Sequence, residues 1–196
     1  IFTSGIIEDK SPSHYQYKGT YIMNAVKSGL MIIDQHRAHV RILYEQYLAQ
    51  LATQKSATQT VLFPESFQLS ATQRIVYEKI AEEMTAMGFD IQDLGAGNYA
   101  INGIPAGLEG VNPVRLVIEM VDTAAENTVS IKEDIDESLA LSMARNAAIP
   151  QGQVLSNVEM ENIVNSLFLC KNPNVTPDGK TILCILKQTE IEHLLG

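Results

Sequence analysis

Apolar and polar residues alternate in two different ways along the chain, and the change of period predicts a mixture of strands and helices. Near the beginning, β-branched and aromatic residues form two runs on either side of the segment Lys27-Ser28-Gly29. Runs of this composition around a glycine-containing turn are typical of an antiparallel hairpin. We therefore expect strands over residues 17–26 and 30–34.

The segment after this hairpin changes to a helical period. From Val40 to Leu51, apolar residues recur at intervals of three and four, which predicts a helix over 36–54 with one apolar stripe. A short apolar run then follows over 60–67. Because Pro64 cannot donate a backbone hydrogen bond, this run is predicted to be an edge strand or an extended crossing segment.

Two later helices are marked by capping boxes. Ser70 with Gln73, and Ser156 with Glu159, have the spacing at which each side chain satisfies the other residue's backbone N–H. The first of these helices is expected to end at Gly88 and the second to run through Phe168. The other predicted elements are strands over 89–94 and 98–104 around Gly95-Ala96-Gly97, helices over 113–123 and 135–148, a polar crossing over 127–134, and a buried strand over 181–186. The expected fold class is α+β.

Composition supports a folded chain without a membrane segment. Of 196 residues, 45% are hydrophobic and 19% are charged, which is ordinary for a globular protein. No run approaches the roughly 20 apolar residues that cross a bilayer, and no signal peptide opens the sequence. We therefore expect a cytoplasmic protein with no membrane partner. Residues 1–15 have no period and resemble the remnant of a linker cut from a longer protein.

The net charge of −9 argues against direct DNA binding by this chain, since contacts to phosphates need a surplus of Lys and Arg on one face. Cys170 and Cys184 form no CxxC pair, so neither a disulfide framework nor a standard zinc site is supported, and both are expected to pack as small hydrophobes. Nucleotide hydrolysis is not expected either, because the chain has no Gly-rich phosphate loop.

The junction of the second strand and the first helix offers the most specific chemistry. Asp34 and His36 lie there, with position 40 one helical turn after His36, so these side chains could converge on a metal ion. The other interpretation is that Asp34 caps the helix while the histidines are partly solvated.

This junction resembles the DQHA-x-x-E-x-x-x-x-E motif of the MutL family of DNA mismatch-repair proteins. Asp34, Gln35, His36 and Glu45 match that motif. In the family's nuclease-competent members the first Glu is a metal ligand, whereas this chain has Val40 there. Valine has no lone pair to offer a cation, and it falls on the apolar stripe of the helix, so packing is its simpler role.

Two further metal-associated segments of the family are also altered. Arg145 stands where the family usually has Cys, and the family's Cys-Pro-His-Gly-Arg segment is similar to Thr176-Pro177-Asp178-Gly179-Lys180. Catalytic metals need three or more protein donors. We therefore predict no catalytic residues, no bound metal and no cofactor in this chain. A weak Mg²⁺ or Mn²⁺ site formed by Asp34, His36 and Asp178 is the alternative.

A second functional segment follows the first predicted helix. In the segment 59–64, Gln59, Leu62 and Pro64 are similar to the family's sliding-clamp-binding peptide. An extended peptide of this kind offers a hydrogen-bonding group, an apolar anchor and a stiffening proline. The alternative is an ordinary edge strand that joins two lobes.

The resemblance implies an architecture of two lobes. An internal dimerisation lobe is expected from residues 16–62 and 136–196, with an external regulatory lobe inserted over 63–135. The expected partners are a second copy in a homodimer, the sliding clamp, a MutS-like mismatch-recognition protein, and DNA indirectly through the full-length protein. A helix carrying Tyr44, Tyr47 and Leu48 could supply an apolar dimer face, or these residues could pack within the monomer.

The predicted function is thus a non-enzymatic dimerisation and partner-docking module for mismatch repair. Two alternatives belong to other classes. The first is a metal-dependent endonuclease with substituted ligands, in which Asp34, His36 and Asp178 hold a cation that activates water. The second is an unrelated α+β interaction domain in which these motifs arise by chance.

Overall fold

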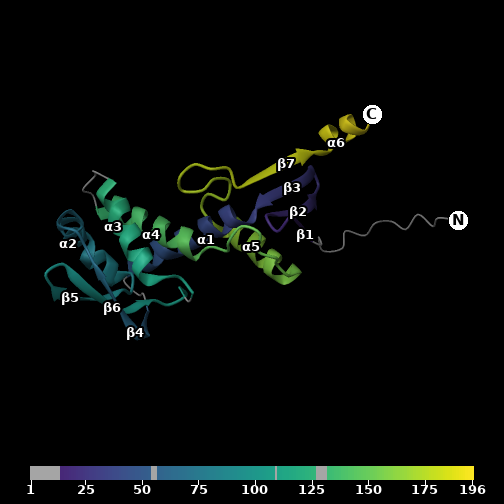
Figure 1. The fold of residues 1–196 in the computed structure, drawn as a ribbon. Helices are drawn as coiled ribbons and strands as arrows, with labels where there is room; N and C mark the ends of the chain where they lie inside the picture. Colours follow the sequence, from purple (N-terminus) through teal and green to yellow (C-terminus); the bar gives the residue numbers. More distant parts are fainter. Residues whose placement is uncertain (1–13, 54–56, 109, 127–131) are drawn as a thin grey trace. The chain divides into compact units, whose positions relative to one another are not determined.

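A computed structural model describes residues 14–53, 57–108, 110–126 and 132–196 of the chain (Figure 1), while side chains 132–134 are not described. The chain divides into two compact units. Unit 1 comprises Ile1–His39 and Ile149–Gly196, and unit 2 comprises Val40–Ala148. Both units contain an antiparallel sheet together with helices, so the expected α+β class is confirmed.

Unit 1 is built on a four-stranded antiparallel sheet in the order β1-β2-β3-β7. Its strands are β1 (Tyr15–Tyr17), β2 (Tyr21–Val26), β3 (Gly29–Asp34) and β7 (Leu183–Lys187). Gly29 follows the two-residue turn between β2 and β3 and has a φ of 149°. A Cβ atom there would overlap the carbonyl oxygen of Leu186, so the close approach of β7 requires glycine.

The helices of unit 1 are α5 (Asn157–Leu169) and α6 (Gln188–Leu195). The predicted capping box begins α5, since Ser156 Oγ accepts from the N–H of Glu159 and the Glu159 carboxylate accepts from the N–H of Ser156. Helix α5 buries one stripe of four apolar residues. Helix α6, in contrast, has no buried residue.

Unit 2 places a three-stranded antiparallel sheet, in the order β4-β6-β5, among helices. The strands are β4 (Thr58–Gln68), β5 (Asp90–Gly95) and β6 (Asn98–Pro105), and the helices are α2 (Ala71–Ala86), α3 (Pro113–Glu126) and α4 (Lys132–Ala147). Helix α1 (Gln35–Thr53) begins in unit 1, and its residues from Val40 onward belong to unit 2.

One hydrophobic core holds unit 2 together. It combines residues of α1, of β4 and the central strand β6, and of helices α2, α3 and α4. Tyr99 of β6 stacks on Phe67 at a centroid distance of 5.6 Å and meets Tyr77 edge-on at 5.1 Å. Aromatic pairs at these distances stabilise a core beyond the apolar area that they bury.

Most predicted elements are confirmed within a few residues. The hairpin over β5 and β6, the capping box of α2 and the edge position of β4 are as expected. Four details differ. The strand expected to be buried over 181–186 is observed as β7, but the residues of β7 are half-buried or exposed because it lies at the edge of its sheet. The predicted strand 17–26 is interrupted by a turn at Lys18 and Gly19, which have positive φ angles of 52° and 61°. Residues 132–134, expected in a polar crossing, belong to α4, and α6 was not expected.

The two compact units divide the chain at 39/40 and 148/149. The physical reason is the core of unit 2, to which α1 and α4 contribute residues such as Tyr47 and Leu139. The lobe boundaries taken from the resemblance, 16–62 with 136–196 and 63–135, stay a prediction. The linker remnant expected over 1–15 lies almost wholly outside the described residues, as do residues 127–131 of the expected crossing.

Within the described ranges, no helix combines the length and the apolar character that a membrane span requires.

Candidate functional site

The junction of β3 and α1 positions the first candidate residues of unit 1. Asp34 ends β3 and is 8% exposed, and its Oδ1 accepts a 3.0 Å hydrogen bond from the backbone N–H of Arg37. Its Oδ2 lies 3.4 Å from Nε of Arg37, whose Nη1 also donates to the carbonyl of Thr181 at 2.8 Å. Asp34 therefore caps α1 through Oδ1. Its Oδ2 forms an ion pair with Arg37, the residue that replaces the motif's alanine.

Gln35 is fully buried and connects three segments of unit 1. Its Nε2 donates to the carbonyls of Gly19 at 2.7 Å and Gln153 at 2.9 Å, and its Oε1 accepts from Nε2 of Gln16 at 2.7 Å. Every polar atom of the amide is thus used inside the protein. A buried and fully bonded amide of this kind holds loops in place, because breaking it leaves polar groups without partners.

Two histidines of α1 are hydrogen bonded to the backbone of the same residue, Ile149. Nδ1 of His36 lies 2.7 Å from the carbonyl oxygen of Ile149, and the backbone N–H of Ile149 donates to Nδ1 of His39 at 2.9 Å. Since a carbonyl only accepts and an N–H only donates, Nδ1 carries the proton in His36 and the lone pair in His39. Burial, and then the charge of neighbouring His36, lowers the pKa of His39 below its ordinary value of 6.5.

The substituted positions Val40 and Arg145 and the matched residue Glu45 lie in unit 2. Val40 is 4% exposed and belongs to the hydrophobic core, as its place on the apolar stripe predicts. Glu45 pairs with Nη1 of Arg41 at 3.6 Å. Arg145 is an exposed residue in the last turn of α4, where a cation is favoured by the helix dipole.

The segment 176–180 forms a closed turn. Thr176 is 3% exposed, and its hydroxyl donates to Oδ1 of Asp178 at 2.7 Å while it accepts from the N–H of Lys180 at 2.8 Å. Asp178 Oδ2 also lies 3.5 Å from Nζ of Lys180. Gly179 has a φ of 84°, a conformation that favours glycine. The threonine and the aspartate of this turn are thus hydrogen bonded to each other.

The candidate ligands therefore do not form one group. Asp34, His36 and Asp178 each contact protein partners, and within residues 14–53, 57–108, 110–126 and 132–196 no three His, Cys, Asp or Glu side chains are placed to hold a metal ion together. The residues of the altered motifs do not fit the metal that the resemblance associates with them.

The candidate clamp-binding peptide occupies a large irregularity in β4. The pairing of β4 with β6 runs from Thr58 to Thr60, breaks off, and resumes at Glu65 with a shifted register. The residues in between form a bulge with exposed apolar side chains, since Leu62 is 92% exposed and Phe63 is 83% exposed. Gln59 and Pro64 are exposed as well. The bulge thus places apolar anchors in solvent, next to the hydrogen-bonding group and the proline.

The sheet of unit 1 has one face without cover in the described structure. Residues that pair across antiparallel strands share a face, so the register places together Ala25 and eight apolar side chains larger than alanine. None of them is buried, and we call the eight larger side chains the open face: Tyr15, Tyr17, Tyr21, Met23, Leu30, Ile32, Cys184 and Leu186. The opposite face is buried at Ile22 and Ile33.

The structure decides between two interpretations of the apolar stripe on α1 and corrects the expectation for one cysteine. Tyr44 and Tyr47 are 8% and 6% exposed within the core of unit 2, and Leu48 packs against the same core, so this helix stripe is not a free dimer face. Cys184, expected to be packed, is exposed on the open face. The stripe of α1 is covered because it shares one core with three other helices and the sheet of unit 2, which spacing alone does not reveal.

Sequence patterns also missed several residues that shape these sites. Gln16 and Gln153 are remote in sequence from Gln35, and no local signal connects them. The open face could have been recognised in the sequence from its tyrosines. They occur at alternate positions along 15–21, where a strand with one solvent-exposed face usually has polar residues.

Comparisons with known proteins agree on one family. The model of the MutL C terminal dimerisation domain matches residues 14–155. The chain is 50% identical over 186 residues to the DNA mismatch repair protein MutL of Bacteroides fragilis, with 95% of this chain and 30% of that protein covered. It is 47% identical over 188 residues to the protein of the same name from Phocaeicola vulgatus, with 96% of this chain and 30% of that protein covered. It is 32% identical over 193 residues to that from Flavobacterium johnsoniae, with 98% of this chain and 30% of that protein covered. The chain therefore spans about a third of the length of these relatives.

Proposed function

The chain belongs to the MutL C-terminal dimerisation domain family, and from this premise we propose that it is the homodimerisation and partner-docking module of a DNA mismatch-repair protein. The open face is the observation that carries this proposal. A set of eight neighbouring apolar side chains on one sheet is costly to leave in water, and an isologous contact between two copies would remove it from solvent.

Several exposed apolar residues outside the sheet support the same interface. Val154, Leu169, Leu194 and Leu195 of unit 1 are each more than 75% exposed. Obligate homodimer interfaces are rich in such residues. In this proposal α6, which has no buried residue in the single chain, acquires a partner only in the dimer.

Sedimentation velocity tests the dimer. At about 20 µM, well above the Kd of a stable homodimer, the chain should sediment as a dimer. Ile32→Glu on the central strand β3 should give a monomer, because a carboxylate on the open face would be buried without a partner. Leu94→Glu, at a residue of β5 that is 53% exposed, is the matched control and should stay dimeric. A monomeric wild-type chain would refute the proposal.

We further propose that the bulge of β4 docks on the sliding clamp. An exposed strip with Leu62 and Phe63 as anchors and Gln59 beside them suits the hydrophobic groove of such a partner. Titration calorimetry with the clamp should show binding that Leu62→Ser with Phe63→Ser reduces at least about tenfold, since these anchors carry the apolar burial. Ile75→Ser on α2, at a residue 59% exposed, is the control. Equal loss in both variants would contradict this docking mode.

The proposed module is not a nuclease. Its candidate ligands are bonded to other protein groups, and the position of the motif's first Glu is a buried valine. In the full-length protein, contacts with a MutS-like protein and with DNA would be made through the other parts. A plasmid-nicking assay with Mn²⁺ and the clamp should give no nicked product. Nicking that Asp34→Asn abolishes would instead establish the metal-dependent endonuclease alternative.

A further inference from the structure

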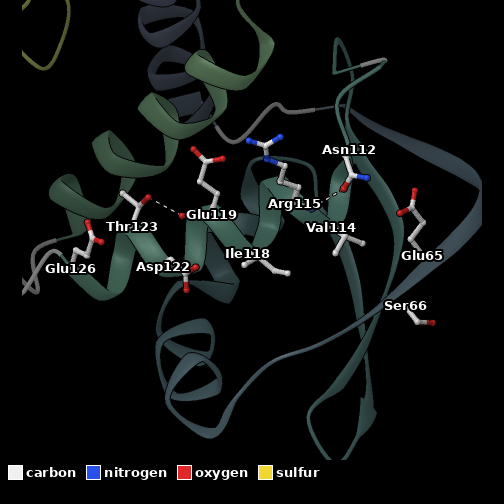
Figure 2. A pocket seen from close by; sticks show the side chains of 10 residues that line it. All are labelled: Glu65, Ser66, Asn112, Val114, Arg115, Ile118, Glu119, Asp122, Thr123 and Glu126. Carbon is white, nitrogen blue, oxygen red and sulfur yellow. Dashed lines mark hydrogen bonds between the residues drawn. The ribbon is translucent and has the colours of Figure 1, made fainter.

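A hollow on unit 2 lies between α3 and β4. It is an open groove of about 910 Å³. Figure 2 shows Val114, Ile118 and Asp122 following one another along α3, with Glu65 and Ser66 on the neighbouring strand. Since residues four apart lie on one side of a helix, this row forms one wall of the groove, and β4 forms the other.

The wall on α3 changes character along its length. Val114 and Ile118 are half-buried and pack against the core of unit 2, so this part of the wall is apolar. Further along, Glu119, Asp122 and Glu126 present carboxylates at intervals of three and four residues, about 5 Å apart along the helix axis. The groove is therefore apolar at one end and acidic at the other.

The groove keeps its negative charge. Four carboxylates line it against one guanidinium, that of Arg115. The hydrogen bonds that the structure gives these carboxylates come from neutral amides, with Gln73 Nε2 donating to Asp122 at 2.8 Å and Asn146 Nδ2 donating to Glu119 at 3.3 Å. Amide donors hold the carboxylates in place without neutralising them. The groove thus attracts a cationic ligand.

The strand beside the groove has a free edge. β4 is the outer strand of the order β4-β6-β5, so its second edge pairs with no other strand in the described ranges. Glu65 and Ser66 already pair with Ile101 and Ala100 of β6 on the inner edge. Backbone groups on the outer edge are available to an extended peptide, whose side chains would alternate between the two sides of the added strand.

We propose that this groove, defined by Glu65, Val114, Ile118, Glu119, Asp122 and Glu126, binds a short extended segment of a partner protein in which Lys or Arg alternates with aliphatic residues. Charge complementarity selects this occupant, since the carboxylates attract its cations. Val114 and Ile118 would contact its aliphatic side chains. The surplus of carboxylates in the groove disfavours an acidic occupant.

Fluorescence anisotropy with a labelled seven-residue peptide of alternating Lys and Leu tests the proposal. We expect weak binding to the 196-residue chain, with a Kd of about 10–100 µM given the small contact area. Two further peptides separate the contributions. Replacing Lys by Glu should abolish binding, and replacing Leu by Ser should weaken it about tenfold through loss of contact with Val114 and Ile118.

Protein variants locate the peptide. Glu65→Lys with Glu126→Lys reverses two exposed charges of the groove and should weaken binding at least about tenfold. Glu78→Lys with Glu82→Lys makes the same change of net charge on exposed residues of α2 that do not line the groove, and it should weaken binding less than about twofold. Circular dichroism should show that both variants are folded.

Three results would overturn the proposal. The first is no binding of the Lys-Leu peptide at millimolar concentration. The second is an equal loss in the two double variants, which would mean attraction by the overall negative charge. The third is a change in the sedimentation of the chain itself on Glu65→Lys with Glu126→Lys, which would mean that the groove is a contact between copies.

Discussion

His39 accepts a 2.9 Å hydrogen bond through Nδ1 from the backbone N–H of Ile149. The bond requires a neutral imidazole, because a protonated ring has no lone pair at that atom. It joins α1 to the residue at which the chain returns to unit 1, and His36 holds the carbonyl of the same residue. The protonation of one ring is therefore coupled to the position of this segment.

We predict that stability falls in mild acid because of this bond. The folded pKa of His39 lies below the unfolded value of 6.5, owing to burial and then to His36. The unfolded chain binds more protons between these two values, so the stabilising contribution is complete above pH 6.5 and is lost as pH falls through the folded pKa.

Urea denaturation between about pH 5 and pH 8 measures this loss, since both histidine states are sampled there. His39→Gln keeps an acceptor that does not titrate, so its stability should depend less on pH. His193→Gln on α6, at an exposed position, should behave as wild type. Identical pH profiles for wild type and His39→Gln would show that this bond does not sense pH.

The buried amide of Gln35 should be important for stability. Gln35→Met keeps the length of the side chain but removes three hydrogen bonds, to Gly19, Gln153 and Gln16, and should cost about 2 kcal/mol in the free energy of unfolding. Gln46→Met changes an exposed residue of the same helix and should stay within about 0.5 kcal/mol of wild type. Chemical denaturation measures both, and equal stability of the two variants would contradict the role of Gln35.

Restoring the family's first Glu at position 40 should not restore a metal site. Val40→Glu places a carboxylate in the core of unit 2, at a position where the valine is 4% exposed, and should lower the free energy of unfolding by about 3 kcal/mol. Leu94→Glu makes a similar change on the surface and should cost less than about 1 kcal/mol. Thermal unfolding with and without Mn²⁺ checks both points. Stabilisation of Val40→Glu by Mn²⁺ would mean that the site assembles after all.

The turn at Thr176 should depend on its hydroxyl. Thr176→Val has nearly the same shape but loses the bonds to Asp178 and to the N–H of Lys180, which should cost about 1–2 kcal/mol. Thr189→Val on α6 changes an exposed threonine and should be neutral. Denaturation curves of the two variants compare them directly. A neutral Thr176→Val would show that the backbone bonds of the turn suffice.

Local sequence signals predicted the elements well where short-range physics decides them. The capping boxes at Ser70 and Ser156 formed as expected, because each one closes within four residues. Asp34 proved to be a helix cap for the same reason. In contrast, α6 was missed although Ile191, Leu194 and Leu195 have helical spacing, because eight residues are too few to define a period.

Contacts between segments remote in the sequence were harder to predict from the sequence. The stripe with Tyr44 and Tyr47 was recognised as apolar, but whether a partner copy or the chain's own core covers it depends on elements up to a hundred residues away. The bulge at Leu62 was foreseen only as a segment of the right composition. Its exposure follows from the register shift between β4 and β6, which no spacing within the segment encodes.

The sequence by itself determined the α+β class, the family and the substitutions that remove the motif's metal donors, because these depend on residue types and on periods of a few residues. Tertiary structure decided which apolar surfaces stay open. The sheet register gathers Tyr17, Tyr21 and Ile32 on one uncovered face, and the approach of α3 to β4 assembles the acidic groove. Both arise from contacts between remote segments, whose energies depend on how the folded chain packs rather than on any local pattern.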